Sequence, residues 1–290
     1  MNHDLAQYMS SSFVQRALIG VVLIAINAGL TGAFAAFRGA TFLVSGAAHA
    51  ALAGAAFVLV VWGSTTGDVA PIIGGAVTAV ILALMAANSG ARADRRGVDN
   101  TIGVGFAFFM ALAVLLISMI PSAAARVWSI LLGDLLLLTS ADLWLLGGMT
   151  AMLMAAFALC WRPFLFITFD MEGAQAFGLR AGLYNYLLFA LIGLSTAVLL
   201  KGVGAIVVFA MLAAPAATAL LFAESVPRTM AYAFLIALLS GVIALVISNY
   251  IQFSVSAMAA LLASGSYFLG RGIVWLRRGA PATAATSTTS

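Results

Sequence analysis

Long apolar runs, each of roughly 20 residues, divide this sequence and limit what it can fold into. A helix of about 20 apolar residues is long enough to cross the hydrocarbon core of a bilayer. Of the 290 residues, 64% are hydrophobic and only 8% are charged, so a soluble globule built from this chain would have an apolar surface. The runs do not alternate with a period of two residues, which excludes a transmembrane β-barrel. The sequence therefore predicts an all-α polytopic membrane protein.

The apolar runs predict eight or nine transmembrane helices. They cover residues 17–37, 46–62, from Pro71 to 87, 101–120, 142–160, 181–200, 205–222, 230–250 and 253–276. The count is eight if one end segment, or the run that carries Pro215, does not cross fully. Residues 127–138 are apolar but too short to cross, which indicates a re-entrant or interfacial helix that carries Asp134. We expect a single transmembrane domain over residues 1–276 and a disordered tail over residues 277–290.

The placement of the arginines predicts the orientation of the chain in the cell membrane. Lys and Arg concentrate in the cytoplasmic loops of membrane proteins. The loops that would be cytoplasmic contain Arg38, Arg92, Arg95, Arg96, Arg162, Arg180, Arg228, Arg271, Arg277 and Arg278. The alternate loops, residues 64–69 and 250–252, carry neither Lys nor Arg, whereas Arg126 and Lys201 depart from the pattern. We therefore expect an outside N-terminus and a cytoplasmic C-terminus.

A short polar segment, residues 169–180, interrupts the apolar pattern on the predicted cytoplasmic side. Asp170 is a favourable N-cap residue, Glu172 places negative charge in the first helical turn, and Gly178 is a natural stop after the last turn. The pattern predicts a helix of about two turns. Two interpretations remain: a plain interfacial helix, or a surface that contacts a soluble partner.

Two ionisable residues are candidates for a site at membrane depth. His49 lies among small residues between Ser45 and Gly54, and an ionisable side chain in a span usually faces a bundle interior or a water path. The alternative for His49 is a structural hydrogen bond between helices. Asp134 is the second candidate, and its alternative is a helix cap after Gly133.

The sixth and seventh apolar runs are joined by residues that shape the backbone. Gly204 closes the stretch Lys-Gly-Val-Gly at residues 201–204 and permits a tight reversal. Pro215 lies inside the seventh run, where a proline removes a backbone hydrogen bond and kinks a helix. The sequence thus predicts a reversal followed by a kinked helix.

Signatures of enzymes and of nucleotide-binding proteins are missing from the sequence. Neither a Gly-x-x-x-x-Gly-Lys-Ser/Thr phosphate-binding loop nor a His-Glu-x-x-His pair occurs. The single cysteine, Cys160, excludes an intrachain disulfide and a cysteine-based metal site. The net charge of +4 comes from arginines spread through short loops and does not indicate nucleic-acid binding. We expect no enzyme, and if ATP drives the protein, another chain hydrolyses it.

Five stretches of the sequence, in order, resemble those of one family, the membrane permeases of the zinc/manganese/iron class of ABC importers. The stretches are residues 42–54, Asp99 with Ile102-Gly103, Leu132-Gly133-Asp134-Leu135-Leu136, residues 170–179, and Val203-Gly204 followed by residues 213–219. The resemblance covers about residues 13–275.

The resemblance implies a transport function and a set of partners. Two permease copies would form the translocation path of a homodimer, and ABC ATPase subunits would dock on their coupling helices. An extracellular or periplasmic binding protein would deliver a divalent metal ion as cargo. The coupling surface would comprise Asp170, Glu172, Ala174, Gly178 and Leu179. No cofactor would be bound permanently, and ATP would bind the partner chain.

The second apolar run departs from the family pattern. The family places Asp and His four residues apart on one helix face, as a gate or transient metal site. Here His49 is kept, but Ser45 stands at the Asp position and Ala53 at that of a proline. Asp134 or another group would then supply the charge, or the ion would pass with little binding. Two alternatives stay open: a permease for a metal chelate such as a siderophore or corrinoid, and a secondary transporter or channel without an ATPase.

Overall fold

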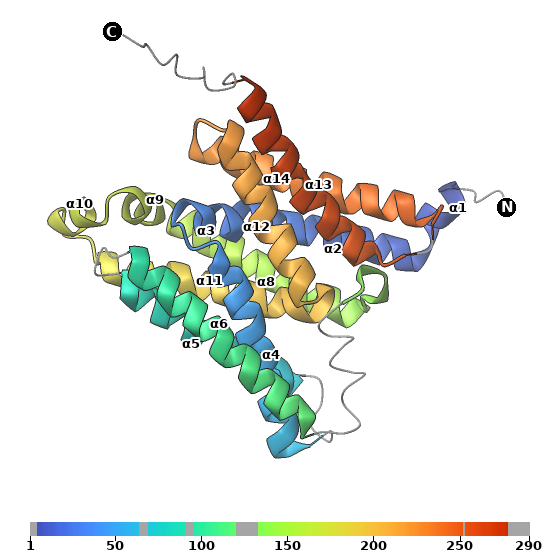
Figure 1. Ribbon diagram of the computed structural model, residues 1–290, viewed down its shortest axis with the longest axis horizontal. Helices are drawn as coiled ribbons and strands as arrows, with labels where there is room; N and C mark the ends of the chain where they lie inside the picture. Colours follow the sequence, from blue (N-terminus) through green and yellow to red (C-terminus); the bar gives the residue numbers. More distant parts are fainter. Residues whose placement is uncertain (1–4, 64–68, 91–94, 120–132, 252, 278–290) are drawn as a thin grey trace, which may run out of the picture.

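Helices make up every regular element of the computed structural model, which describes residues 5–63, 69–90, 95–119, 133–251 and 253–277 (Figure 1). Nine stretches within these ranges are long and apolar enough to cross a membrane. They are the first span (Ser12–Phe37), α4 (Phe42–Trp62), α5 (Val69–Gly90), α6 (Arg95–Ser118), α8 (Ser140–Leu159), α11 (Ala181–Val203), α12 (Ala205–Phe222), α13 (Val226–Ser248) and α14 (Val255–Arg277). The predicted all-α membrane fold is confirmed, with the higher of the two expected span counts in the described part of the chain.

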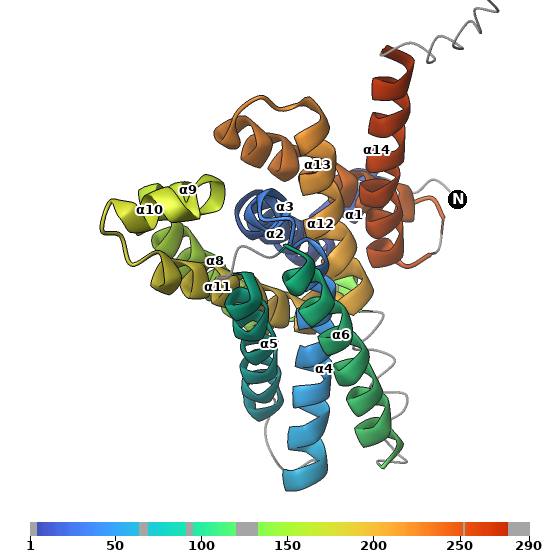
Figure 2. The ribbon, with the colours of Figure 1, turned by 60° about the vertical axis from the view of Figure 1, so that its left-hand side comes forward.

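Four spans form the interior of the bundle, and the others surround them. Between 61% and 67% of the apolar stretch is buried in the first span, α4, α11 and α12, against 22–33% in α5, α6, α8, α13 and α14. The outer helices expose large apolar side chains such as Val104, Leu115 and Phe268, as expected of surfaces that face lipid. α4 packs against α5 and α6, and α12 packs against α13 and α14 (Figures 1 and 2).

The contact between α4 and α5 is closest at two glycines. A Cβ atom at Gly54 would lie within 3.0 Å of the Gly74 oxygen and of Thr78 Oγ1, and one at Gly74 would lie 2.7 Å from the Gly54 oxygen. Thr78 Oγ1 donates to the Ala50 carbonyl oxygen across the same contact, at 2.6 Å. Helices in lipid gain little from the hydrophobic effect when they associate, so small residues that let backbones approach provide much of the attraction.

A π-helical turn interrupts the first span. α2 (Ser12–Asn27) passes into the π-helical turn η1 (Ala28–Gly32) and then into α3 (Ala33–Phe37). A Cβ atom at Gly32 would lie within 3.0 Å of the Leu212 oxygen of α12, so this glycine lets two inner helices approach closely. Turns of this type occur mostly as single insertions in α-helices and often mark functional positions.

Four buried polar side chains join the first span to α8 and α11 beside this turn. Asn27 Nδ2 donates to Thr150 Oγ1, and Ser195 Oγ donates to Asn27 Oδ1, both at 2.8 Å. Thr31 Oγ1 donates to the Asn27 carbonyl oxygen at 2.9 Å. All four are at most 2% exposed, and because each has a partner, burial leaves no unpaired amide on Asn27.

The helix ends gather at two sides of the bundle, as alternating spans require. Asn185, near the start of α11, donates through Nδ2 to the Ala87 carbonyl oxygen near the end of α5, at 3.0 Å. Two short helices, α9 (Trp161–Phe169) and α10 (Met171–Ala176), lie at this same side (Figure 1). The polar segment at residues 169–180 therefore lies outside the spans, next to the ends of α5 and α11.

Two sequence-based expectations concern residues that are only partly described. In the apolar segment 127–138, residues up to 132 lie outside the described part, and the remainder forms a 3-10 turn, η2 (Leu135–Leu137). The expected disordered tail, residues 277–290, falls outside it from residue 278 onward and stays a prediction.

Candidate functional site

His49 lies two turns into α4, where its imidazole is held in one orientation. Nδ1 lies 2.9 Å from the carbonyl oxygen of Ser45, an atom that only accepts hydrogen bonds, so Nδ1 carries the proton of the neutral ring. The lone pair then lies on Nε2, and a neutral imidazole is the form that binds metal ions. The ring also packs against Phe106 of α6, with centroids 4.7 Å apart. The hydrogen bond of Nδ1 lies within α4, whereas the structural alternative for His49 predicts a hydrogen bond between helices.

Ser45 and His49 share one face of α4 but differ in exposure. Ser45 is 8% exposed, whereas His49 is half-buried. Phe42 packs against Phe106 and Phe209, with centroid distances of 5.3 and 6.4 Å, so aromatic rings from α4, α6 and α12 border this face. One imidazole nitrogen and one neutral hydroxyl form a weak ligand set for a divalent ion.

Asp134 caps a turn. Its Oδ1 accepts a hydrogen bond from the Leu136 amide at 3.0 Å, at the start of η2. Gly133 has φ +57°, and a Cβ atom there would collide with the backbone of Val203 and Gly204 at the α11–α12 connection. This is the helix-cap alternative, and a role for Asp134 on the translocation path stays a prediction. Among the described residues, no three His, Cys, Asp or Glu side chains are placed to hold a metal ion.

The α11–α12 connection is the tight reversal that the sequence predicts. Gly204 has φ +90° and is the one residue between the two helices. Pro215 lies inside α12, where it offers no amide hydrogen to the Met211 carbonyl oxygen. The kink at Pro215 stays a prediction.

α10 is capped at both ends, as its sequence predicts. Asp170 is the N-cap residue, and its Oδ1 accepts a hydrogen bond from the Gly173 amide at 2.7 Å. At the other end Gly178 has φ +78°, and the Leu179 amide donates to the Ala174 carbonyl oxygen at 3.0 Å. These contacts form a Schellman motif, which stops a helix and fixes the direction of the chain after it. α10 is therefore a rigid, well-defined protrusion rather than an irregular loop.

The predicted coupling residues differ in burial. Ala174 is completely buried, and Leu179 packs against the same core. Glu172 is exposed, and so is Phe177, at 82%, which the sequence pattern did not single out. An aromatic residue in a polar segment outside the spans was the signal that could have found it. Phe177 also borders an open hollow of about 400 Å³ next to the start of α11.

Known proteins resemble this chain over almost its whole length. The profile of the ABC 3 transport family matches residues 10–272. The chain is 30% identical to the manganese transport system membrane protein MntC of Halalkalibacterium halodurans, over 91% of this chain and 88% of that protein. It is 31% identical to the manganese import system permease protein ScaB of Streptococcus parasanguinis, over 89% of each chain.

Solved structures share the fold. A chain of PsaBC from Streptococcus pneumoniae, solved in complex with a Fab, matches with a TM-score of 0.78 and 25% identity, over 93% of this chain and 95% of that one. A metal-chelate type ABC transporter in an inward-facing conformation matches with a TM-score of 0.69 and 15% identity, over 90% and 86% of the two chains. The second likeness is one of fold alone.

Proposed function

Because the chain belongs to the ABC 3 transport family and is the membrane permease of an ABC-type metal importer, we propose that it carries a divalent transition-metal ion of the manganese type past His49. The observation that carries this proposal is the orientation of the ring, whose Nδ1 is bound to the Ser45 carbonyl oxygen. Nε2 then holds the lone pair that an ion can use. The two manganese relatives support the choice of ion.

The weak ligand set at this position is consistent with a conduit. A path through a membrane must bind its cargo well enough to admit it and weakly enough to release it. Ser45 contributes no charge, so an ion at His49 would keep part of its water shell. A storage or cofactor site would instead require several charged ligands at one point.

The importer assignment implies partners, and we propose how they meet this chain. An ABC permease works with an ATPase and a binding protein. Two copies of the chain would form the path, and each would present α10 to an ATPase subunit through the exposed side chains of Glu172 and Phe177. Arg38, Arg162 and Arg180 flank this side, which supports its placement in the cytoplasm together with the C-terminus.

Metal uptake tests the proposal. Cells would carry this chain with its ATPase and binding protein, and accumulation of manganese, zinc, iron and cobalt would be measured. We expect ATPase-dependent uptake of manganese that is lost in His49→Ala, because the variant removes the one imidazole on this face of α4. His3→Ala is the matched control, since His3 is the only other histidine in the chain.

Two outcomes would count against this assignment. If an assembled complex takes up none of the four ions, the cargo is a metal chelate or another solute. If His49→Ala keeps wild-type manganese uptake, the ion does not depend on His49.

A further inference from the structure

Arg38 connects several elements at the side of the bundle that carries α10. It follows α3 directly and is half-buried. Its Nη1 donates to the Ile167 carbonyl oxygen of α9 at 2.8 Å, and its Nη2 donates to Asn185 Oδ1 of α11 at 2.5 Å. The guanidinium carbon also lies 5.7 Å from the centroid of the Phe189 ring, within the range of a cation–π contact.

The residues that receive these hydrogen bonds are themselves fixed. Ile167 and Asn185 are both completely buried, and Asn185 Nδ2 donates to the Ala87 carbonyl oxygen of α5 at 3.0 Å. The Ile167 acceptor is a backbone atom, so the position of Arg38 follows the helix axis of α9 rather than a flexible side chain. One guanidinium thus joins the first span to α9 and α11 and, through Asn185, to α5.

Arg38 also lies between the coupling segment and the helix that carries His49. On one side, Asp170 is both the C-cap of α9 and the N-cap of α10, so α9 and α10 are joined at a single residue. On the other side, α4 begins at Phe42, shortly after Arg38, and His49 lies seven residues further along α4, about 10 Å along the axis. A displacement of α9 therefore reaches α4 through one hydrogen bond, from Arg38 to the Ile167 carbonyl oxygen, and the short connection from Arg38 to Phe42.

We propose that Arg38 is a positioning residue for transport, which transmits movement of α9 and α10 to α4 and so to Ser45 and His49. The inference rests on the proposed function, in which an ATPase moves α10. Arginine suits this role because its planar fork reaches two acceptors at once, whereas a lysine ammonium acts as a single point charge. Arg38 couples α10 to His49 only if a movement at one of them changes the position of the other, and transport measurements test this.

A simpler role for Arg38 predicts a different result. A cation after the last turn of a helix interacts favourably with the helix dipole, and a long side chain at a membrane surface anchors the span. Either effect would change the amount or stability of the complex. Neither would change the number of ions transported per ATP hydrolysed, and this ratio is therefore the measurement that separates the two roles.

The test uses the complete complex of permease, ATPase and binding protein in proteoliposomes. Manganese uptake and ATP hydrolysis are measured in the same preparation for wild type, Arg38→Gln and Arg38→Lys. We expect Arg38→Gln to lower the ratio of ions to ATP about tenfold, within the usual range of coupling between sites. Arg38→Lys keeps the charge but not the fork and should give an intermediate ratio.

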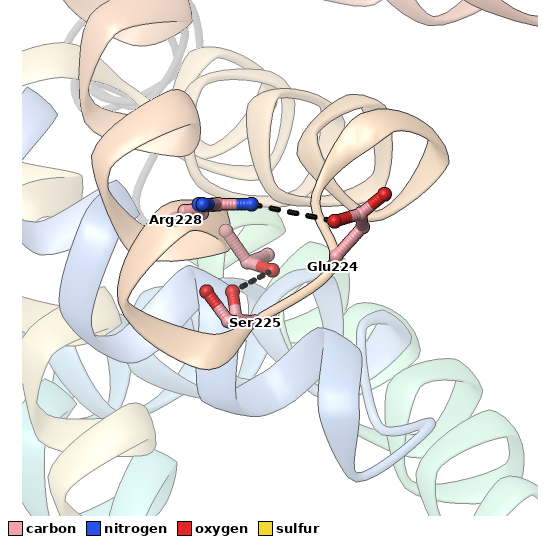
Figure 3. A network of polar contacts seen from close by, with 4 residues as sticks. Glu224, Ser225 and Arg228 are labelled. Atoms are coloured by element: carbon pink, nitrogen blue, oxygen red, sulfur yellow. Dashed lines mark hydrogen bonds and ion pairs between the residues drawn. The ribbon is translucent and has the colours of Figure 1, made fainter.

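Arg228→Gln is the matched control. Arg228 lies in the first turn of α13, where it forms an exposed ion pair at 3.3 Å with Glu224 of the α12–α13 connection (Figure 3). The Thr229 hydroxyl donates to the Ser225 carbonyl oxygen beside this pair. Exposed pairs of this kind contribute little to stability. Arg228→Gln should therefore leave the ratio at its wild-type value.

The outcomes separate this inference from the proposed function. Lack of ATP-dependent manganese transport by wild type refutes the proposed function, whatever the variants do. Transport by wild type together with an unchanged ratio in Arg38→Gln overturns the role of Arg38. If Arg38→Gln does not assemble, Arg38→Lys decides, and a wild-type ratio in that variant overturns the role equally.

Discussion

Replacement of Gly54 by alanine should force α4 and α5 apart. The added Cβ atom would lie within 3.0 Å of the Gly74 oxygen, the Gly74 carbonyl carbon and Thr78 Oγ1, and two of these are backbone atoms that have no rotamer to change. Overpacking of this kind typically costs about 1–3 kcal/mol. Separation of the helices also stretches the hydrogen bond from Thr78 to the Ala50 oxygen, which is worth about 1 kcal/mol.

The substitution also has a favourable effect on helix stability, which reduces the net loss. Alanine is a better helix former than glycine by about 1 kcal/mol. The net expectation for Gly54→Ala is therefore a loss of about 1–3 kcal/mol. Gly103→Ala is the matched control, because Gly103 is also helical and a Cβ atom there would meet nothing within 4 Å. That variant should be as stable as wild type or slightly more stable.

Heat treatment of the detergent-purified protein tests this expectation. Membrane proteins often unfold irreversibly. The fraction of protein that stays monodisperse after heating is therefore compared among the variants at one heating rate. We expect the midpoint of Gly54→Ala to fall by several degrees relative to Gly103→Ala. Equal midpoints for the two variants would refute the argument that direct backbone contact holds α4 against α5.

Two further predictions concern the coupling segment and the path. Phe177→Ser should weaken binding of the ATPase about tenfold or more, since exposed aromatic anchors often dominate an interface; co-purification measures this, and full recovery of the ATPase would exclude Phe177 from the contact. Ser45→Asp should strengthen metal retention about tenfold or more, because a unit charge about 4 Å away is worth on the order of 4 kcal/mol near a protein surface before the carboxylate is desolvated. The amount of metal that stays bound after gel filtration measures this retention, and a value equal to that of wild type would mean that Ser45 does not face the ion.

The lengths of the apolar runs were sufficient to predict the fold, because a bilayer requires about 20 apolar residues per span. The boundaries were harder to predict. α4 begins at Phe42 rather than at residue 46, because Leu43, Val44 and Ser45 are buried in the bundle as part of the helix. The π-helical turn Ala28–Gly32 left no recognisable pattern, because it depends on contacts with other helices.

The sequence predicted those features of the candidate site that depend on residue type. It did not predict those that depend on tertiary contacts. A histidine in a span and a capped polar helix both stand out in the sequence, and the caps at Asp170 and Gly178 are present. The sequence identifies Arg38 only as a marker of orientation, because its hydrogen-bond acceptors lie more than 120 residues further along the chain. Phe177 resembles many other aromatic residues in the sequence until its exposure is known.

The π-helical turn also sets the direction in which the end of the first span points. A turn closed by i→i+5 hydrogen bonds holds one residue more than an α-helical turn, so the residues after it are rotated by about 100° relative to an uninterrupted α-helix. Arg38 lies beyond this turn, so its hydrogen bonds to Ile167 and Asn185 depend on that rotation. The direction in which a residue at the end of the span points around the helix axis is thus set inside the bundle, where the hydrogen bonds of Asn27 hold the turn.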